Sequence, residues 1–181
     1  MSSKNWNFVF AGFGGQGILF AGKVTAYTGM VDNREVSWLP SYGPEMRGGT
    51  ANCSVCLSAT PIGSPLVLSP NALVVMNGPS YDKFIDTVEP GGVVIIDSTL
   101  IEQTTLRTDI TALYLPATKL AKDAGIPKLA NLIMLGALVK ATGFTTQASL
   151  EQAIQKCVPA KKPELLELNL KAIELGKQAV K

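Results

Sequence analysis

The sequence predicts an α/β fold: a single doubly wound, mostly parallel sheet domain with a helical C-terminal third. Three observations predict it. A glycine-rich turn follows the first apolar run and leads into a helical pattern. Short apolar runs then alternate with helical segments, which is the arrangement of parallel strands joined by crossovers. From residue 116 onward the patterns are helical. A chain of 181 residues can bury a sizeable core, so we expect one domain, residues 1–181.

The first element is a strand that begins near Phe8 and ends in the glycine turn. A helix is expected over residues 16–27, ended by Gly29. The turn matches the spacing G-x-G-x-x-G, which lets backbone approach a ligand closely and directs helix N–H groups at an anion; the three glycines are Gly12, Gly14 and Gly17. A plain tight turn between a packed strand and helix has the same pattern. We expect no side chain to be tolerated at Gly14 or Gly17.

A dinucleotide site also needs an acidic residue at the end of the second strand. Glu35 has about the right offset from the turn, but it precedes the predicted strand 36–39. Four residues of strand place Glu35 roughly 13 Å from the end where ligands gather. This argues against a nicotinamide or flavin cofactor.

The segment after that strand, residues 40–49, is dense in turn formers and still carries tyrosine, glutamate, methionine and arginine. It is expected at the same end of the sheet as the glycine turn, where open α/β sheets bind ligands. Arg47 beside Gly48 and Gly49 suits a phosphate or carboxylate, because a guanidinium is flanked there by exposed backbone N–H groups. A buried structural salt bridge is the alternative for Arg47.

The remaining elements follow from apolar runs and chain breakers. Strands are predicted over residues 50–58, 72–77, 93–97 and 111–115. Helices are predicted over 78–88, from Pro116, over 130–142 up to Gly143, from a capping box of Ser149 and Gln152 to Pro159, and from Pro163. The last helix carries two adjacent apolar stripes: Leu165, Leu168, Ala172, Leu175 and Leu166, Leu170, Ile173. So broad a face is expected to cross the sheet or to meet another chain.

The residues that could do chemistry are few. The chain has no histidine, which removes the commonest general base and most zinc sites. Cys53 and Cys56 have C-x-x-C spacing, but residues three apart on a strand point to opposite faces, so buried structural thiols are the favoured interpretation over a metal or redox site. Asp97 closes a strand at the ligand end, and we expect it to cap the following turn.

Composition limits the function further. The 16 basic and 14 acidic residues form no basic stripe, which argues against nucleic acid. Charged residues are only 17%, against about 25% in typical domains. Other subunits covering the surface, or a larger core, would explain this equally well. The start shows no signal peptide, no apolar run could span a bilayer, and three cysteines suit a reducing compartment; a cytoplasmic protein is expected.

Three motifs together resemble the gamma subunit, or gamma domain, of 2-oxoacid:ferredoxin oxidoreductases. They are GGQG at 14–17, SYGPEMRGG at 41–49 and PIGSP at 61–65. The likeness extends over about residues 6–175. SYGPEMRGG is the most specific of the three, because no general requirement of a fold demands that order of residues.

The resemblance implies a multisubunit enzyme that oxidatively decarboxylates a 2-oxoacid, transfers the acyl group to coenzyme A and reduces ferredoxin. It implies thiamine diphosphate with magnesium and iron–sulfur clusters, carried mainly by the partner alpha, beta and delta subunits. The chain itself has neither a diphosphate-and-magnesium motif nor a cysteine set for a cluster. Its length is most similar to the 2-oxoglutarate type, then to the branched-chain or pyruvate types.

Carried over by motif, the functional surface near the coenzyme A region comprises Gly14, Gly15, Gln16, Gly17, Tyr42, Glu45, Arg47 and Gly48. The alternative from another class is a free-standing nucleotide- or phosphate-binding regulatory protein, whose glycine turn holds a phosphate without redox chemistry.

Overall fold

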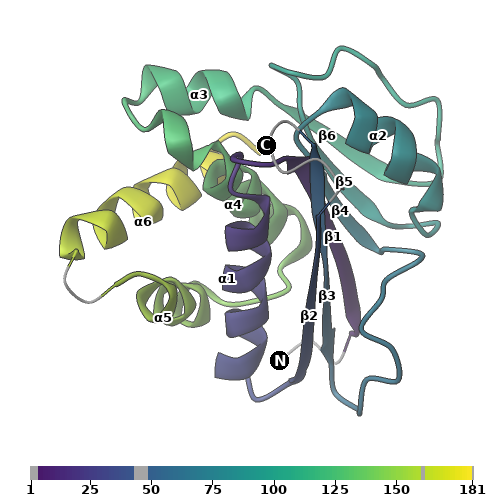
Figure 1. Ribbon diagram of the computed structural model, residues 1–181, viewed down its shortest axis with the longest axis horizontal. Helices are drawn as coiled ribbons and strands as arrows, with labels where there is room; N and C mark the ends of the chain where they lie inside the picture. Colours follow the sequence, from purple (N-terminus) through teal and green to yellow (C-terminus); the bar gives the residue numbers. More distant parts are fainter. Residues whose placement is uncertain (1–3, 43–48, 160–161, 181) are drawn as a thin grey trace.

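A six-stranded sheet runs through the centre of the computed structural model, which describes residues 4–42, 49–159 and 162–180 (Figure 1). The strands lie in the order β2-β3-β1-β4-β5-β6. Their bounds are β1 (Trp6–Phe13), β2 (Glu35–Tyr42), β3 (Thr50–Ser58), β4 (Ala72–Val75), β5 (Val93–Asp97) and β6 (Thr111–Leu115). The helices are α1 (Ile18–Val31), α2 (Gly78–Phe84), α3 (Ala117–Asp123), α4 (Ala130–Thr142), α5 (Gln147–Cys157) and α6 (Pro163–Gln178), with single 3-10 turns η1 (Ile85–Thr87) and η2 (Pro127–Leu129).

Strands β1, β4, β5 and β6 are parallel, whereas β3 runs antiparallel between β1 and β2. Phe13 pairs with Thr50, and Tyr42 pairs with Ala51. The segment between β2 and β3 therefore starts and ends beside the end of β1. The described ends of this segment lie near the glycine turn, as predicted, but antiparallel pairing brings them there, not a parallel neighbour. Residues 43–48 of the segment lie outside the described residues. The α/β fold class with a mostly parallel sheet and C-terminal helices is likewise confirmed.

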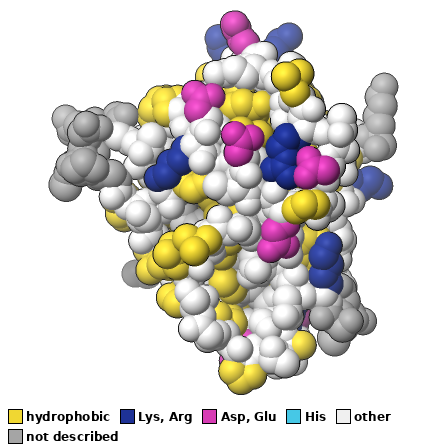
Figure 2. Space-filling view, turned by 90° about the vertical axis from the view of Figure 1, so that its right-hand side faces the viewer, with side chains coloured by type: hydrophobic (Ala, Val, Ile, Leu, Met, Phe, Trp, Pro, Cys, Tyr) yellow, Lys and Arg dark blue, Asp and Glu magenta, His cyan; other side chains and the backbone are white. Residues whose placement is uncertain are grey.

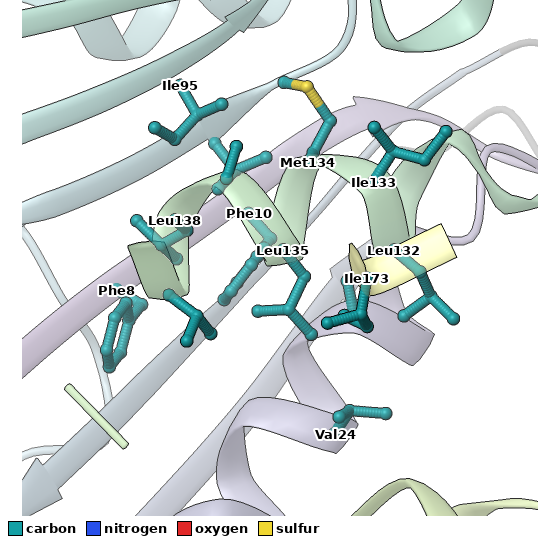
Figure 3. Close-up of a cluster of buried hydrophobic side chains, with 14 of the residues drawn as sticks. Phe8, Phe10, Val24, Ile95, Leu132, Ile133, Met134, Leu135, Leu138 and Ile173 are labelled. Atoms are coloured by element: carbon teal, nitrogen blue, oxygen red, sulfur yellow. The ribbon is translucent and has the colours of Figure 1, made fainter. Parts of the chain in front are cut away.

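One face of the sheet, called here the helical face, is covered by α1, α3, α4, α5 and α6 (Figure 1). Helix α4 supplies the centre of this core, because its ten residues from 130 to 139 are all buried. Figure 3 shows side chains of α4, such as Leu135 and Leu138, gathered with Phe8, Phe10 and Ile95 of the sheet. Because every side of this stretch is buried, α4 has apolar residues around most of its circumference and no distinct polar face.

The other face, called here the strap face, has a lighter cover. Helix α2 and η1 lie over β4 and β5, where Leu73, Val75 and Ile96 pack against Tyr81 and Ile85. Over β3 lies an extended segment, residues 59–71, called here the strap. The N–H of Val67 donates to Ser54 Oγ at 3.2 Å, and Cys56 Sγ lies 3.9 Å from the carbonyl oxygen of Ser64. Hydrogen bonds therefore hold the strap where a helix would otherwise lie.

Most predicted bounds are confirmed, and several differ. The strand predicted over 72–77 ends at Val75, and the helix predicted over 78–88 ends at Phe84 and is followed by the turn η1. Strand β2 continues through Pro40 to Tyr42, which an edge strand tolerates. Helix α1 continues past Gly29 to Val31, because Gly29 lies against Leu57 of β3 and lets the helix approach the sheet.

Two further differences lie in the C-terminal helices and concern the cap of α5 and the buried face of α6. The cap of α5 is Thr146, whose hydroxyl accepts the N–H of Ser149, so the predicted cap at Ser149 lies one turn inside the helix. The buried stripe of α6 is centred elsewhere than predicted, on Asn169, Ala172, Ile173 and Gly176.

Candidate functional site

The glycine turn and Tyr42 border one hollow at the carboxyl end of β1. Its volume is about 250 Å³. The hollow is lined by Phe13, Gly14, Gly15, Gly17, Ile18, Leu19, Phe20, Tyr42 and Ala51. The structure thus brings together four of the predicted site residues: Gly14, Gly15, Gly17 and Tyr42. Tyr42 is 72% exposed, so its ring is available to a ligand or a partner.

Gln16, a fifth predicted residue, uses its side chain inside the turn. Its Oε1 accepts the N–H of Phe13 at 2.6 Å, and its Nε2 donates to the carbonyl oxygen of Met76 at 2.9 Å. These bonds join the end of β1 to the residue that follows β4. Gln16 therefore sets the shape of the turn, because both ends of its amide are engaged with backbone.

Gly17 is the position where the turn most needs glycine. Its φ of 75° lies in the left-handed region, and a Cβ there would come within 2.5 Å of Asn131 Nδ2. The same Nδ2 donates to the carbonyl oxygen of Gly17 at 2.9 Å. The predicted intolerance of Gly17 to a side chain has this physical basis.

Gly14 differs from Gly17. Its φ lies outside the left-handed region, and a Cβ would make only an ordinary contact of 3.8 Å with the Gly49 carbonyl. The predicted intolerance at Gly14 is therefore wrong for its described surroundings. Gly12 is the restricted glycine instead, because a Cβ there would meet Gln16 Oε1 at 2.5 Å and Ile18 Cδ1 at 2.9 Å.

Asn131 is a site residue that the sequence analysis missed. It lies in the first turn of α4, is 3% exposed, and its Oδ1 has no hydrogen-bond partner among the described residues. A polar side chain at the start of a helix that is otherwise apolar was the signal that could have identified it. Asn131 ties α4 to the N-terminal end of α1.

The hollow offers backbone donors and apolar walls. Gly14 N–H is occupied, because it donates to the Gly49 carbonyl at 3.0 Å. Within the described parts of the chain, the N–H groups of Gly15 and Gly17 have no acceptor. The first turn of α1 adds N–H groups that a helix cannot satisfy internally, together with the positive end of its dipole. Such an edge can receive an anion next to an apolar group.

No charged side chain lines this hollow among the described residues. The charged candidates Glu45 and Arg47, together with Gly48, lie outside the described residues. The segment that contains them joins Tyr42 to Gly49, and both of these residues lie beside the glycine turn.

Asp97 lies outside this hollow and is fully buried at the end of β5. Its carboxylate accepts the N–H of Thr99 at 3.0 Å and both the N–H and the hydroxyl of Thr118, at 3.1 and 2.5 Å. The prediction that it caps the following turn is confirmed. It also fixes the start of α3.

The thiols of Cys53 and Cys56 are free and buried on opposite faces of the sheet. Burial raises the pKa of Cys53 to about 12 and also raises the pKa of Cys56. These are properties of structural thiols, as predicted. Within residues 4–42, 49–159 and 162–180, no group of three His, Cys, Asp or Glu side chains could hold a metal ion.

Glu35 is exposed at the far end of β2, where it pairs with Ser58, so it does not reach the glycine turn.

The fold is that of a doubly wound α/β domain, and the hollow lies at the carboxyl end of its first strand, where open α/β sheets commonly bind ligands. Residues 7–179 match the family described as "Pyruvate ferredoxin/flavodoxin oxidoreductase". The chain belongs to this family. None of the described helices has the length and apolar character needed to cross a membrane.

Two curated relatives and one solved structure show how the family is built. The chain is 40% identical over 168 residues to "Ketoisovalerate oxidoreductase subunit VorA" of Methanothermobacter thermautotrophicus, covering 92% of this chain but 34% of VorA. It is 38% identical over 174 residues to "2-oxoglutarate synthase subunit KorC" of Methanocaldococcus jannaschii, covering 94% and 91%. A keto/oxoacid ferredoxin oxidoreductase gamma subunit from Geobacter sulfurreducens superposes with a TM-score of 0.84, at 29% identity over 97% and 96% of the two chains. The chain therefore spans about a third of VorA but nearly all of KorC.

Proposed function

We propose that this chain is the gamma subunit of a multisubunit enzyme that oxidatively decarboxylates a 2-oxoacid to an acyl-CoA and reduces ferredoxin. Its 181 residues form one gamma-type domain in this proposal, and its partners are alpha, beta and delta subunits in the cytoplasm. The observation that carries the proposal is the hollow beside Tyr42 and the glycine turn. Two segments of the family's motifs, far apart in the chain, meet there.

The chemistry of the hollow supports a role beside coenzyme A. A phosphate group suits the N–H groups of Gly15 and Gly17, which have no acceptor among the described residues, and the apolar walls suit the uncharged parts of the same molecule. Arg47, two residues before Gly49, adds the planar fork that matches phosphate or carboxylate.

Thiamine diphosphate, magnesium and iron–sulfur clusters are proposed to lie on the partner subunits. The described residues contain no group of three His, Cys, Asp or Glu side chains that could hold a metal ion, and three cysteines fall short of the four that an ordinary cluster requires. We expect the purified chain to be colourless and inactive. A stoichiometric iron–sulfur absorption band in the single chain would contradict this assignment.

The proposed substrate is 2-oxoglutarate. The similarity to the 2-oxoglutarate synthase subunit KorC extends over 91% of KorC, whereas the similarity to VorA extends over 34% of VorA. Assays of the reconstituted complex with 2-oxoglutarate, pyruvate and branched-chain 2-oxoacids test this choice. The alternative of a free-standing phosphate-binding regulatory protein gains no support from the relatives. Native mass spectrometry of the complex purified from its source distinguishes the two.

The experiment that tests the site is a titration of coenzyme A into complexes containing Arg47→Ala or Arg47→Lys. Loss of a hydrogen bond to a charged group predicts weaker coenzyme A binding by about 1.5 to 3 kcal/mol for alanine, with partial retention for lysine. Lys156→Ala, which removes an exposed charge from α5, is the matched control. A complex that assembles normally and keeps its Michaelis constant for coenzyme A with Arg47→Ala would overturn the assignment of Arg47.

A further inference from the structure

Two hollows flank β1, and the side chain of Gln16 lines neither of them. One is the hollow of the glycine turn. The other, of about 310 Å³, opens on the strap face above Val9 and Asn52. Figure 2 looks onto the strap face, where apolar and uncharged side chains dominate the lower left. Gly15 and Gly17, on either side of Gln16 in the chain, line the first hollow, so the Gln16 side chain must act elsewhere.

The side chain of Gln16 lies where β1 and β4 part. Just beyond the end of β4, the N–H of Met76 donates to the carbonyl oxygen of Ala11 at 2.9 Å. In a parallel ladder, the next bond would run from the N–H of Phe13 to the carbonyl oxygen of Met76. Instead, the Phe13 N–H donates to Gln16 Oε1, and Gln16 Nε2 donates to the Met76 carbonyl oxygen. One side-chain amide therefore replaces a bond of the ladder; this arrangement is called here the amide bridge.

Gly12 provides the space for the amide bridge. It is buried, and a Cβ there would meet Gln16 Oε1 at 2.5 Å. At the other end of the glycine pattern, a Cβ on Gly17 would meet Asn131 Nδ2 at 2.5 Å. Both outer glycines thus make room for side-chain amides of this chain. These contacts explain the two positions without a dinucleotide.

The amide bridge lies at the switch point of the sheet. After β1 the chain enters α1 on the helical face, whereas after β4 it enters α2 on the strap face (Figure 1). Open α/β sheets bind ligands in the crevice at such a point. Here the Gln16 amide fills the gap between the two strand ends and engages the backbone groups that face it. A ligand is therefore directed outward, to the hollow at Gly15 and Gly17.

We infer that Gln16 is a positioning residue, whose amide bridge fixes the peptide units that bind coenzyme A. Gln16 stands between Gly15 and Gly17, so anchoring its side chain at both ends restricts the backbone that carries their N–H groups. Without the amide, the Phe13 N–H and the Met76 carbonyl would be free to pair directly, and the turn would change shape. The identity of the ligand rests on the proposed function, whereas the amide bridge does not.

The first test uses the full chain alone. Gln16→Met keeps the length of the side chain but can form neither bond of the amide bridge. Exchange of the Gly14 amide, which donates to the Gly49 carbonyl and not to Gln16, should accelerate about tenfold as the turn loosens. Gln152→Met is the matched control, because Gln152 is exposed on α5 and lines neither hollow. Gly14 exchange in this control should equal that of the wild type.

The second test asks whether Gly12 acts through Gln16. Gly12→Ala places a Cβ where Gln16 Oε1 lies, so its effect on Gly14 exchange should resemble that of Gln16→Ala. The double variant should then exchange no faster than the more affected single variant, because both changes remove the same bridge. Effects that multiply in the double variant would contradict this link and point to the contact of Gly12 with Ile18 instead.

The third test uses the reconstituted oxidoreductase. Gln16→Met should raise the Michaelis constant for coenzyme A about fivefold or more and leave kcat within about twofold, because Gln16 would position the ligand without touching a reacting group. A role in packing alone predicts that methionine restores both constants. Gln152→Met should change neither.

Faster Gly14 exchange together with a raised Michaelis constant in Gln16→Met supports the inference. Unchanged Gly14 exchange overturns it. Faster exchange with an unchanged Michaelis constant also overturns it, because the amide bridge would then serve the fold alone. A wild-type complex whose rate does not depend on coenzyme A overturns the proposed function and the positioning of coenzyme A, whereas exchange in the free chain still decides whether the amide bridge holds the turn.

Discussion

The two faces of the sheet bury apolar side chains in different ways. On the helical face, α4 is buried at ten successive positions and α6 crosses it at closely packed glycines. On the strap face, α2 has seven residues, and an extended segment replaces a helix over β3. The helical face thus supplies most of the packing that stabilises the fold. The strap face leaves Leu66 and Leu68 largely exposed, so these side chains contribute little to the packing of the chain.

The largest effect should come from the glycines between α4 and α6. A Cβ on Gly176 would overlap the carbonyl oxygen of Ile133, and a Cβ on Gly136 would overlap that of Ile173. Because backbone cannot move aside cheaply, Gly176→Ala should lower the free energy of unfolding by about 3 kcal/mol or more in urea denaturation. In Gly63→Ala, a variant of the strap, the new Cβ has no atom within 4 Å. This variant should change the free energy of unfolding by about 0.5 kcal/mol or less. Equal effects at the two positions would remove the contrast between the faces.

The next comparison shortens an apolar side chain on each face. Leu135 is fully buried among α4, α6 and the sheet, so Leu135→Ala should cost about 3 kcal/mol through lost transfer energy and a cavity. Val67 of the strap is only partly buried, and Val67→Ala should cost about 1 kcal/mol. Urea titrations of both variants measure the difference. A larger loss for Val67→Ala would mean that the strap, too, is part of the stabilising core.

The third prediction concerns the link between the helical face and the site. Asn131→Ala removes the bond to the Gly17 carbonyl and should cost about 2 kcal/mol. Thr25→Val is the control. Thr25 is also buried, and its hydroxyl donates to the carbonyl oxygen of Ala21 within α1. Hydrogen exchange of the amides at 14–18 should accelerate in Asn131→Ala only. Similar exchange in both variants would show that Asn131 stabilises the fold without holding the turn.

The fourth prediction uses the buried thiol on the helical face. The pKa of Cys53 is about 12 in the folded chain, against 9.0 for an unperturbed thiol. Because burial disfavours the thiolate, the stabilising effect is complete below pH 9 and is lost as pH rises from 9 towards 12. Stability should fall by about 1 kcal/mol between pH 9 and pH 10 from this group. Denaturant titrations at both pH values should show a smaller fall for Cys53→Ala than for Cys157→Ala, and equal falls would contradict the role of Cys53.

Much of the fold could be predicted because its signals are local. Strands β3, β5 and β6 have the predicted bounds, since apolar runs between chain breakers determine them. Helix α4 ends at Gly143 for the same reason: the left-handed φ of 60° needed there suits glycine. The meeting of Tyr42 with the glycine turn was also predictable, because Tyr42 ends one strand, the glycine turn follows another, and the two strands point the same way.

By itself the sequence determined the element types, the fold class and the motif residues, because apolar periodicity and breakers act over a few neighbouring positions. Only the tertiary structure decided the antiparallel insertion of β3, the helical surroundings of Gly29 and the place of Asn131 beside Gly17. Asn131 and Gly17 are 114 residues apart, and no local propensity reports such a contact. Packing decides it, because a buried amide must find an acceptor and a glycine leaves the space for it.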